Sequence, residues 1–335
     1  MLEEFSDIVC KISEYLTDKD KIRFSATSTI MNKSKYKFTY HKRVRVDKIA
    51  HLAYFENFRR VVLVDGGIVN FPKNAEEVRL CTGKNKVPYG VTHLIFSELE
   101  DYLNPSSIPD TVRQIYFDDE YDESLRGCIP SSVTHITLSY DFDMPIDNTF
   151  PNSITHLTFG CEFDCPVAGN LPSSLTHLVF GDYFNQSITD AIPSSVIELT
   201  FGNNFNQTIR GNIPFGVTHL TLGQFFNKRI KNSKNAAGRT VPTIPASVTN
   251  LTFGYSFNQP IKKYIPDSVT DLSFGTCFNK PVNNLPTSVT HLQIGFGFNK
   301  PLYDLPASIT HLMIPIAYTK PIPATVKERM NIIRF

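Results

Sequence analysis

A short sequence pattern recurs from residue 88 towards the C-terminus, and it constrains the fold more than any other feature. Clear copies read IPSSVTHITL, LPSSLTHLVF and IPASVTNLTF. Each copy opens on a proline, and successive prolines are 20 or 21 residues apart, except for one longer step. Units in such close register identify a repeat protein. The opening prolines are Pro88, Pro109, Pro130, Pro151, Pro172, Pro193, Pro214, Pro245, Pro266, Pro286 and Pro306.

The apolar positions inside each unit are as regular as the prolines. In one unit Leu175 lies three residues after Pro172. Leu178 and Phe180 then alternate with polar or small residues, which predicts a short strand. A glycine comes next in most units, and we expect it to supply a turn. A Phe-Asn pair such as Phe184-Asn185 and an aliphatic residue then close the unit. We expect the asparagine amide to satisfy backbone groups, repeating as a ladder.

These patterns predict a mainly β repeat solenoid. Roughly five apolar side chains per unit cannot enclose a core alone, so each unit must stack on its neighbours. Each side chain that becomes fully buried contributes about 1.5–3 kcal/mol. The opening proline fixes φ and discourages a helix from running through that point. The longer step contains the segment KNSKNAAGRT, which we predict to be a polar surface loop.

The composite pattern LPxSVTHLTFGxxFNQPI resembles the FNIP repeat, a short relative of the leucine-rich repeat found in amoebae and in giant viruses that infect them. The resemblance implies a leucine-rich-repeat-like solenoid, and the stretches 58–64 and 71–80 are similar to degenerate leading units. The expected organisation is a helical module, leading repeats, the solenoid and a C-terminal cap, at residues 1–48, 49–87, 88–322 and 323–335.

The first 48 residues do not repeat. Apolar residues recur there at helical spacing, and Thr17 or Asp18 is suited to capping a second helix. We predict two or three short helices. They are either a cap on the repeat stack or a separate docking module, since an amphipathic helix alone is compatible with both.

The stretch from Phe5 to Leu16, followed by Asp20-Lys21-Ile22, is similar to an F-box. That resemblance implies binding to the Skp adaptor of a cullin-RING ubiquitin ligase through the apolar face of the helices. The early Leu-Pro pair of the F-box is replaced by Glu4-Phe5. The positions that match the adaptor-facing residues are Ile8, Val9, Ile12, Leu16 and Ile22.

Histidines occupy one column of the repeat, and a ladder of imidazoles is a conceivable metal site. Other polar residues share this column, which favours a structural ladder over a metal site. We expect no metal, no cofactor and no catalysis, since no P-loop, GxSxG or HExxH pattern occurs. The column contains His93, His135, His156, His177, His219, His291 and His311, with Gln114, Glu198, Asn250 and Asp271 at the remaining positions.

Charge is balanced overall but segregated along the chain. The formal net charge is +1, which argues against a general polyanion binder such as a nucleic-acid coat. Residues 98–164 contain 14 acidic and 2 basic residues, whereas residues 210–335 contain 14 basic and 4 acidic ones. Each half is able to steer an oppositely charged partner, although solvated loops that keep the array soluble give the same pattern.

No window approaches 18 consecutive apolar residues, the N-terminus is acidic, and six cysteines show no framework spacing. We therefore expect no membrane association, reduced thiols and a cytoplasmic or nuclear location, in a host cell if the protein is viral. Partner recognition is expected where the repeats differ. The preferred contact patch is Tyr116 with Asp118, Asp119 and Glu120, and an ordinary solvent-facing strand position is the alternative.

Together these observations favour a substrate-recognition subunit of a cullin-RING ubiquitin ligase. The N-terminal module is expected to bind the adaptor, and the solenoid is expected to bind a target protein. The alternative is a stand-alone protein-binding scaffold whose N-terminal helices only cap the repeats.

Overall fold

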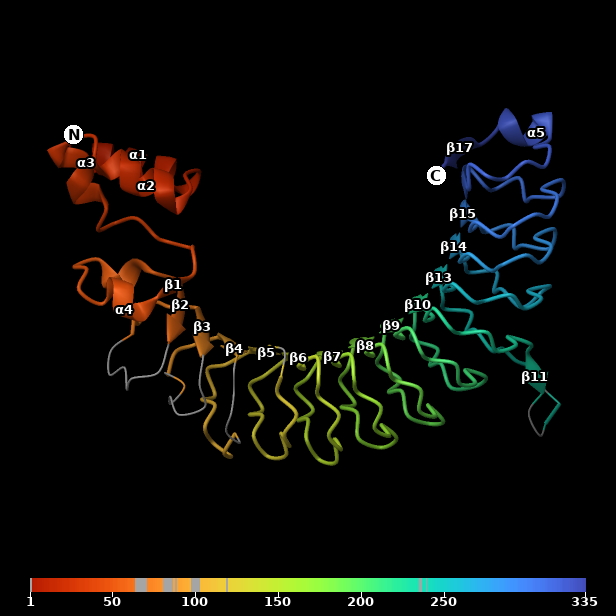
Figure 1. The fold of residues 1–335 in the computed structure, drawn as a ribbon, viewed down its shortest axis with the longest axis horizontal. Coiled ribbons are helices and arrows are strands. Elements are labelled where there is room, and N and C mark those ends of the chain that lie inside the picture. Colours follow the sequence, from red (N-terminus) through yellow and green to blue (C-terminus); the bar gives the residue numbers. More distant parts are fainter. Residues whose placement is uncertain are drawn as a thin grey trace. The chain divides into compact units, whose positions relative to one another are not determined.

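The computed structural model describes residues 2–63, 71–80, 87, 89–97, 103–118, 120–234, 237–238 and 240–335. The chain divides into two units, which are coloured by sequence in Figure 1. The first unit contains Met1–Tyr121 and Gly127–His135, and the second contains Asp122–Arg126 and Ile136–Phe335.

The N-terminal region forms three short helices, as predicted: α1 (Leu2–Glu14), α2 (Asp18–Ser25) and α3 (Thr29–Ser34). Thr17 caps α2, because its side-chain oxygen accepts the backbone N–H of Asp20 at 3.3 Å. Ser28 caps α3 through the N–H of Met31 at 3.1 Å. Of the two cap residues proposed for α2, Thr17 is therefore correct, and Asp18 is the first helical residue.

The rest of the first unit is built from short parallel strands that pair in chain order. The predicted leading units supply two of these strands, and the predicted division at residue 48 falls inside a short helix. The elements are β1 (Val44–Arg45), α4 (Val46–Ile49), η1 (Phe55–Asn57), β2 (Arg60–Leu63), β3 (Glu77–Leu80), β4 (His93–Phe96) and β5 (Gln114–Phe117). Strand β6 (His135–Thr137) contains the point where the chain passes into the second unit.

The second unit is a parallel solenoid, and we call each of its turns a rung, named by its strand. Adjacent strands pair in register, so that each repeat column forms a line of neighbours. Strands β10 and β13 pair directly, which leaves the insertion outside the ladder. The strands are β7 (His156–Thr158), β8 (His177–Val179), β9 (Glu198–Thr200), β10 (His219–Thr221), β13 (Asn250–Thr252), β14 (Asp271–Ser273), β15 (His291–Gln293) and β16 (His311–Ile314).

Two details differ from a plain stack of repeats. The insertion contains a small antiparallel pair, β11 (Ser233–Lys234) with β12 (Thr240–Val241), where the sequence predicted only a loop. At the C-terminus, α5 (Ala324–Lys327) precedes β17 (Asn331–Arg334), which pairs in parallel with β16 and continues the ladder.

Phenylalanine stacks fill the core of the second unit. In the β8 rung, Phe180 and Phe184 are buried, and their ring centroids lie 4.0 Å apart. Between rungs the spacing is 5.4 Å for Phe180 with Phe201, and 6.1 Å for Phe184 with Phe205. The rungs therefore spread apart with distance from the strands, and the strand layer lies on the inner side of this unit's curve (Figure 1).

Side-chain ladders connect successive rungs. The backbone N–H of Asn206 donates to Oδ1 of Asn185 at 2.9 Å, and that of Asn227 donates to Oδ1 of Asn206 at 3.0 Å. This confirms the predicted asparagine ladder. A serine ladder was not predicted: the Ser195 hydroxyl donates to the carbonyl oxygen of Leu175 at 2.6 Å, and the same contact recurs in other rungs. Both ladders satisfy polar groups that stacking would otherwise bury unpaired.

The glycine column has a different cause from the predicted one. Its members do not have the positive φ that would make glycine necessary for a turn. Instead, a Cβ atom built on Gly181 would lie 1.6 Å from the carbonyl oxygen of Gly160, and one on Gly202 would lie 2.0 Å from that of Gly181. Glycine is required here because the backbones of neighbouring rungs approach too closely for any side chain.

Candidate protein-binding surfaces

The helical module leaves several large apolar side chains in contact with solvent. Ile8 is 57% exposed, Ile12 is 44% exposed and Ile22 is 54% exposed. Ile8 and Ile12 are four residues apart in α1 and so share one face of that helix. Leu16 is half-buried. Val9 is only 2% exposed, so its assignment as an adaptor-facing residue is wrong, because packing within the module already covers it.

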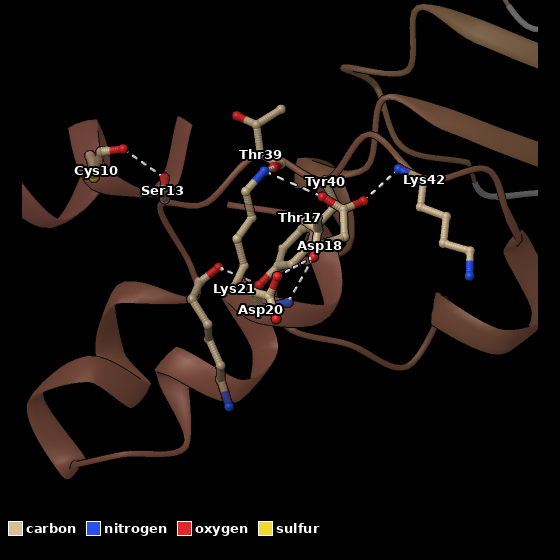
Figure 2. Close-up of polar contacts among 10 residues, drawn as sticks. Cys10, Ser13, Thr17, Asp18, Asp20, Lys21, Thr39, Tyr40 and Lys42 are labelled. Atoms are coloured by element: carbon tan, nitrogen blue, oxygen red, sulfur yellow. Dashed lines mark hydrogen bonds and ion pairs between the residues drawn. The ribbon is translucent and has the colours of Figure 1, made fainter. Parts of the chain in front are cut away.

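A buried lysine ties α2 to the segment that follows the three helices. Lys21 is only 4% exposed, and its Nζ donates to the carbonyl oxygen of Thr39 at 2.6 Å and to Asp18 Oδ1 at 3.3 Å. The other carboxylate oxygen of Asp18 accepts the backbone N–H of Lys42 (Figure 2). Lys21 and Asp18 of α2 thus both bind backbone groups of residues 39–42, the segment that leads into β1.

Aromatic packing continues the same junction. The Tyr40 ring is buried and stacks on Phe58 with centroids 4.8 Å apart, and the two residues form a parallel backbone bridge. Burial is the main reason why the pKa of the Tyr40 hydroxyl is raised, and the nearby Tyr54 and Asp18 raise it further. The module therefore both packs on the first strands of its own unit and keeps an exposed apolar surface, so the two interpretations drawn from the sequence are compatible.

The acidic patch predicted around Tyr116 is less open than the sequence indicates. Tyr116 is exposed on β5, and Glu120 is exposed beyond it. Asp118, however, forms an ion pair with the guanidinium of Arg79, whose Nε also donates to Ser97 Oγ at 3.0 Å. Its charge is already matched within the chain. Asp119 lies outside the described residues.

The histidine column lies on the strand face that points away from the core, as predicted. The rings of His156 and His177 stack with centroids 4.0 Å apart, and His177 Nε2 is 3.6 Å from Glu198 Oε1. The hydroxyl of the preceding threonine contacts the ring nitrogen, for example Thr176 Oγ1 with His177 Nδ1 at 2.8 Å. Within the described ranges, no group of three metal-ligating side chains is close enough to hold an ion.

A second part of this column lines a shallow hollow of about 290 Å³ on the strand face. His291 Nδ1 is 3.4 Å from Asp271 Oδ1, and the rings of His291 and His311 stack at 4.5 Å. Gln293 and Met313 also line the hollow, together with residues of β13 and β14. The hollow is open and shallow, so it is suited to contact with a side chain of a partner.

A row of exposed apolar side chains on the turns after the strands was missed by the sequence analysis. The two residues that follow the glycine position, which is Ser139 in the first of these rungs and Pro315 in the last, form this turn, and in most rungs one of them is large and apolar. The signal is visible in the aligned repeats, whereas the sequence-based prediction placed the contact patch on the strand at Tyr116. We call these residues the edge row: Tyr140, Tyr183, Phe225, Tyr255, Phe296 and Ile316.

No helix among the described residues is long and apolar enough to cross a membrane. None of the five cysteines Cys10, Cys128, Cys161, Cys165 and Cys277 in the same part of the chain forms a disulfide.

Comparison with known proteins identifies the repeat. The FNIP repeat matches residues 121–162, 163–204, 240–277 and 257–297. The FNIP repeat-containing protein L415 of Acanthamoeba polyphaga mimivirus is 30% identical over 131 residues, which make up 32% of this chain and 31% of that protein. The chain therefore matches less than a third of the length of this relative.

Among solved structures, CroV588, described as a novel circular LRR protein, aligns with a TM-score of 0.73 and 28% identity. The alignment covers 88% of this chain and 51% of CroV588. YopM from Yersinia enterocolitica WA-314 aligns with a TM-score of 0.40 and 12% identity, over 76% of this chain and 62% of YopM. The chain carries FNIP repeats on a leucine-rich-repeat-like solenoid, a fold that typically serves as a non-catalytic protein-binding scaffold.

Proposed function

We propose that this FNIP-repeat solenoid is a non-catalytic receptor that joins a target protein to a cullin-RING ubiquitin ligase. The solenoid holds the target, and the N-terminal module binds the Skp adaptor. The observation that carries the proposal is the exposure of Ile8 and Ile12 on one face of α1 and of Ile22 on α2. Such apolar patches on an otherwise packed module mark protein interaction sites.

The anchoring of the module supports a receptor rather than a loosely tethered adaptor-binding tail. Lys21 is buried and its Nζ donates to the carbonyl oxygen of Thr39, so rotation of α2 away from the segment that leads into β1 would break that hydrogen bond, while the ion pair with Asp18 lies within α2 and would rotate with it. A hydrogen bond to a charged group contributes about 1.5–3 kcal/mol. The stack of Tyr40 on Phe58 joins this segment to the first repeats, which gives a target bound on the strands of the first unit a defined position relative to the adaptor.

A stand-alone scaffold is the second candidate. The stack of Tyr40 on Phe58 and the contacts of Lys21 are what a cap needs, and they would be present without any adaptor. Both candidates place the protein in the cytoplasm or nucleus, where free thiols remain reduced. They differ only in whether the exposed isoleucines have a partner.

A pulldown with purified Skp adaptor separates the two. Wild-type protein and a variant with Ile8→Asp and Ile12→Asp are compared, and Ile197→Asp serves as the matched control because Ile197 is 42% exposed in the solenoid. We expect wild type and control to retain the adaptor and the double variant to lose it, with unchanged circular dichroism. If wild type does not retain the adaptor, the receptor role is wrong and the scaffold remains.

A further inference from the structure

The edge row lies on a preformed and continuous surface of the second unit. Backbone hydrogen bonds hold the turns of successive rungs in register: Tyr183 N–H donates to Cys161 O at 2.9 Å, and Phe225 N–H donates to Asn203 O at 2.8 Å. The same contact joins Cys277 to Tyr255 at 2.8 Å. Because the backbone fixes these turns, the row needs no rearrangement to meet a partner.

The row exposes more apolar surface than scattered single residues would. Its five aromatic side chains are 49 to 58% exposed, and Ile316 is 70% exposed. Burial of a whole aromatic side chain removes about 150–250 Å² from solvent. Because about half of each of the six side chains is exposed, a partner that covers the row would bury about 600 Å² of it. Two such rows pressed together would bury about 1,200 Å², which is within the range of specific protein interfaces.

Charge along the row is completely segregated. Residues 127–209 contain no Lys or Arg, and residues 272–303 contain no Asp or Glu. The first rungs carry carboxylates at the turn or just after it, and the last rungs carry a lysine just after the Phe-Asn or Tyr-Thr pair. Within the described part of the chain, none of these groups forms an ion pair. They are Asp141, Asp143, Glu162, Asp164 and Asp182 at one end, and Lys280, Lys300 and Lys320 at the other.

The order of the rungs makes this pattern self-complementary. The turns begin at Tyr140, Cys161, Asp182, Asn203, Gln224, Tyr255, Thr276, Phe296 and Ile316, so the turn of Gln224 and Phe225 is the fifth of nine. Reversal about that central turn places the Asp141 rung opposite the Lys320 rung. It also places the Glu162 rung opposite the Lys300 rung, and the Asp182 rung opposite the Lys280 rung.

We propose that the edge row is the interface of an antiparallel homodimer, in which a two-fold axis passes through the central turn at Phe225. Each acidic rung of one copy meets a basic rung of the other, and Phe225 meets its own counterpart. The interface is isologous, the commonest arrangement in protein dimers. Three unpaired lysines on neighbouring rungs repel each other in a monomer, and the facing carboxylates of a second copy remove that repulsion.

This dimer does not depend on adaptor binding, because the edge row lies entirely in the second unit and the proposed adaptor surface lies in the first. A dimer displays two helical modules and two strand faces. If the adaptor pulldown fails, the dimer is still expected. If the chain is monomeric, the proposed receptor role is unaffected.

Charge-reversal variants test the pairing of the rungs. One variant carries Lys300→Glu and Lys320→Glu, and the other carries Asp141→Lys and Glu162→Lys. Sedimentation velocity and light scattering give the oligomeric state of each alone and of the two mixed. We expect a wild-type dimer, at least tenfold weaker self-association of each variant, and a restored dimer in the mixture, because both ends of the interface then pair opposite charges.

Matched controls separate the interface from general surface effects. Lys262→Glu with Lys263→Glu makes the same charge change away from the edge row, and Phe215→Ala matches Phe225→Ala at another exposed phenylalanine. Only Phe225→Ala is expected to weaken the dimer, and added salt is expected to weaken the wild-type dimer as well. A monomeric wild type, a mixture that stays monomeric, or equal effects of test and control variants would each overturn the proposal.

Discussion

Replacing Gly202 with alanine tests why a glycine column runs along the second unit. A Cβ at this position would lie 2.0 Å from the carbonyl oxygen of Gly181 and 2.7 Å from Cα of Asp182. All of these neighbours are backbone atoms, so no side chain is able to rotate away. The two rungs would have to separate by more than about 1 Å before the atoms reach ordinary contact distance.

That separation acts on the hydrogen bonds that surround the glycine. Asn204 N–H donates to Asp182 O at 2.7 Å, and Phe180 N–H donates to Thr200 O at 2.9 Å. Loss of both costs about 1–3 kcal/mol, and the strain of overpacking adds about 1–3 kcal/mol. We therefore expect Gly202→Ala to lower the free energy of unfolding by about 2–6 kcal/mol.

Gly211 is the matched control, because its φ is +74° and nothing lies within 4 Å of its Cβ position. Alanine there meets only the left-handed backbone penalty of about 1–2 kcal/mol, and asparagine meets less because it visits that region more readily. Urea unfolding followed by circular dichroism measures each variant. If Gly202→Ala and Gly211→Ala lose equal free energies of unfolding, close backbone approach is not the cause of the glycine column. A Gly202→Asn variant that is as stable as Gly211→Asn would refute that cause as well.

Three further outcomes follow from the ladders, a shielded thiol and the junction. Asn185→Ala removes the acceptor of one backbone N–H, and we expect a loss of about 1–3 kcal/mol in urea unfolding, whereas Asn185→Asp, which keeps an acceptor oxygen, is expected to cost less. Burial, and then the carboxylate of Asp143, raise the pKa of the Cys165 thiol to about 11. The rate of Cys165 alkylation should therefore increase only as the pH rises towards that value. In Asp143→Asn the increase should begin at lower pH. An unchanged dependence of the rate on pH in this variant would contradict the role given to Asp143. Lys21→Ala leaves the carbonyl of Thr39 without its donor, and hydrogen exchange of α2 should rise at least tenfold while exchange in the solenoid strands stays constant.

The repeat made most of the fold predictable. Every rung repeats the same apolar positions, so one unusual residue does not hide the pattern of its column. The strands, the core and the asparagine ladder were therefore all predicted. The cause of the glycine column was not, because a sequence shows that a side chain is absent without showing which backbone atoms exclude it. The Ser195 contact was missed for a similar reason: its acceptor is a backbone carbonyl, which every residue has.

The candidate surfaces were less predictable because burial depends on neighbours that are distant in sequence. Val9 and Ile12 are both apolar and both fit a helical face, yet only packing from outside α1 decides that Val9 is covered. Asp118 appeared free because its partner Arg79 lies 39 residues earlier, two strands away in the ladder. Exposure and pairing, rather than residue type, separate contact surfaces from structural positions here.

The direction of the inter-rung contacts bears on how the protein is made. The donors of Asn206 and Ser195 reach back to acceptors in the preceding rung, and each column glycine is needed only because of the backbone before it. A ribosome releases the chain in that same order. Each newly emerged rung therefore meets acceptors that the preceding rung has already placed, and the helices held by Lys21 are synthesised before the first repeat.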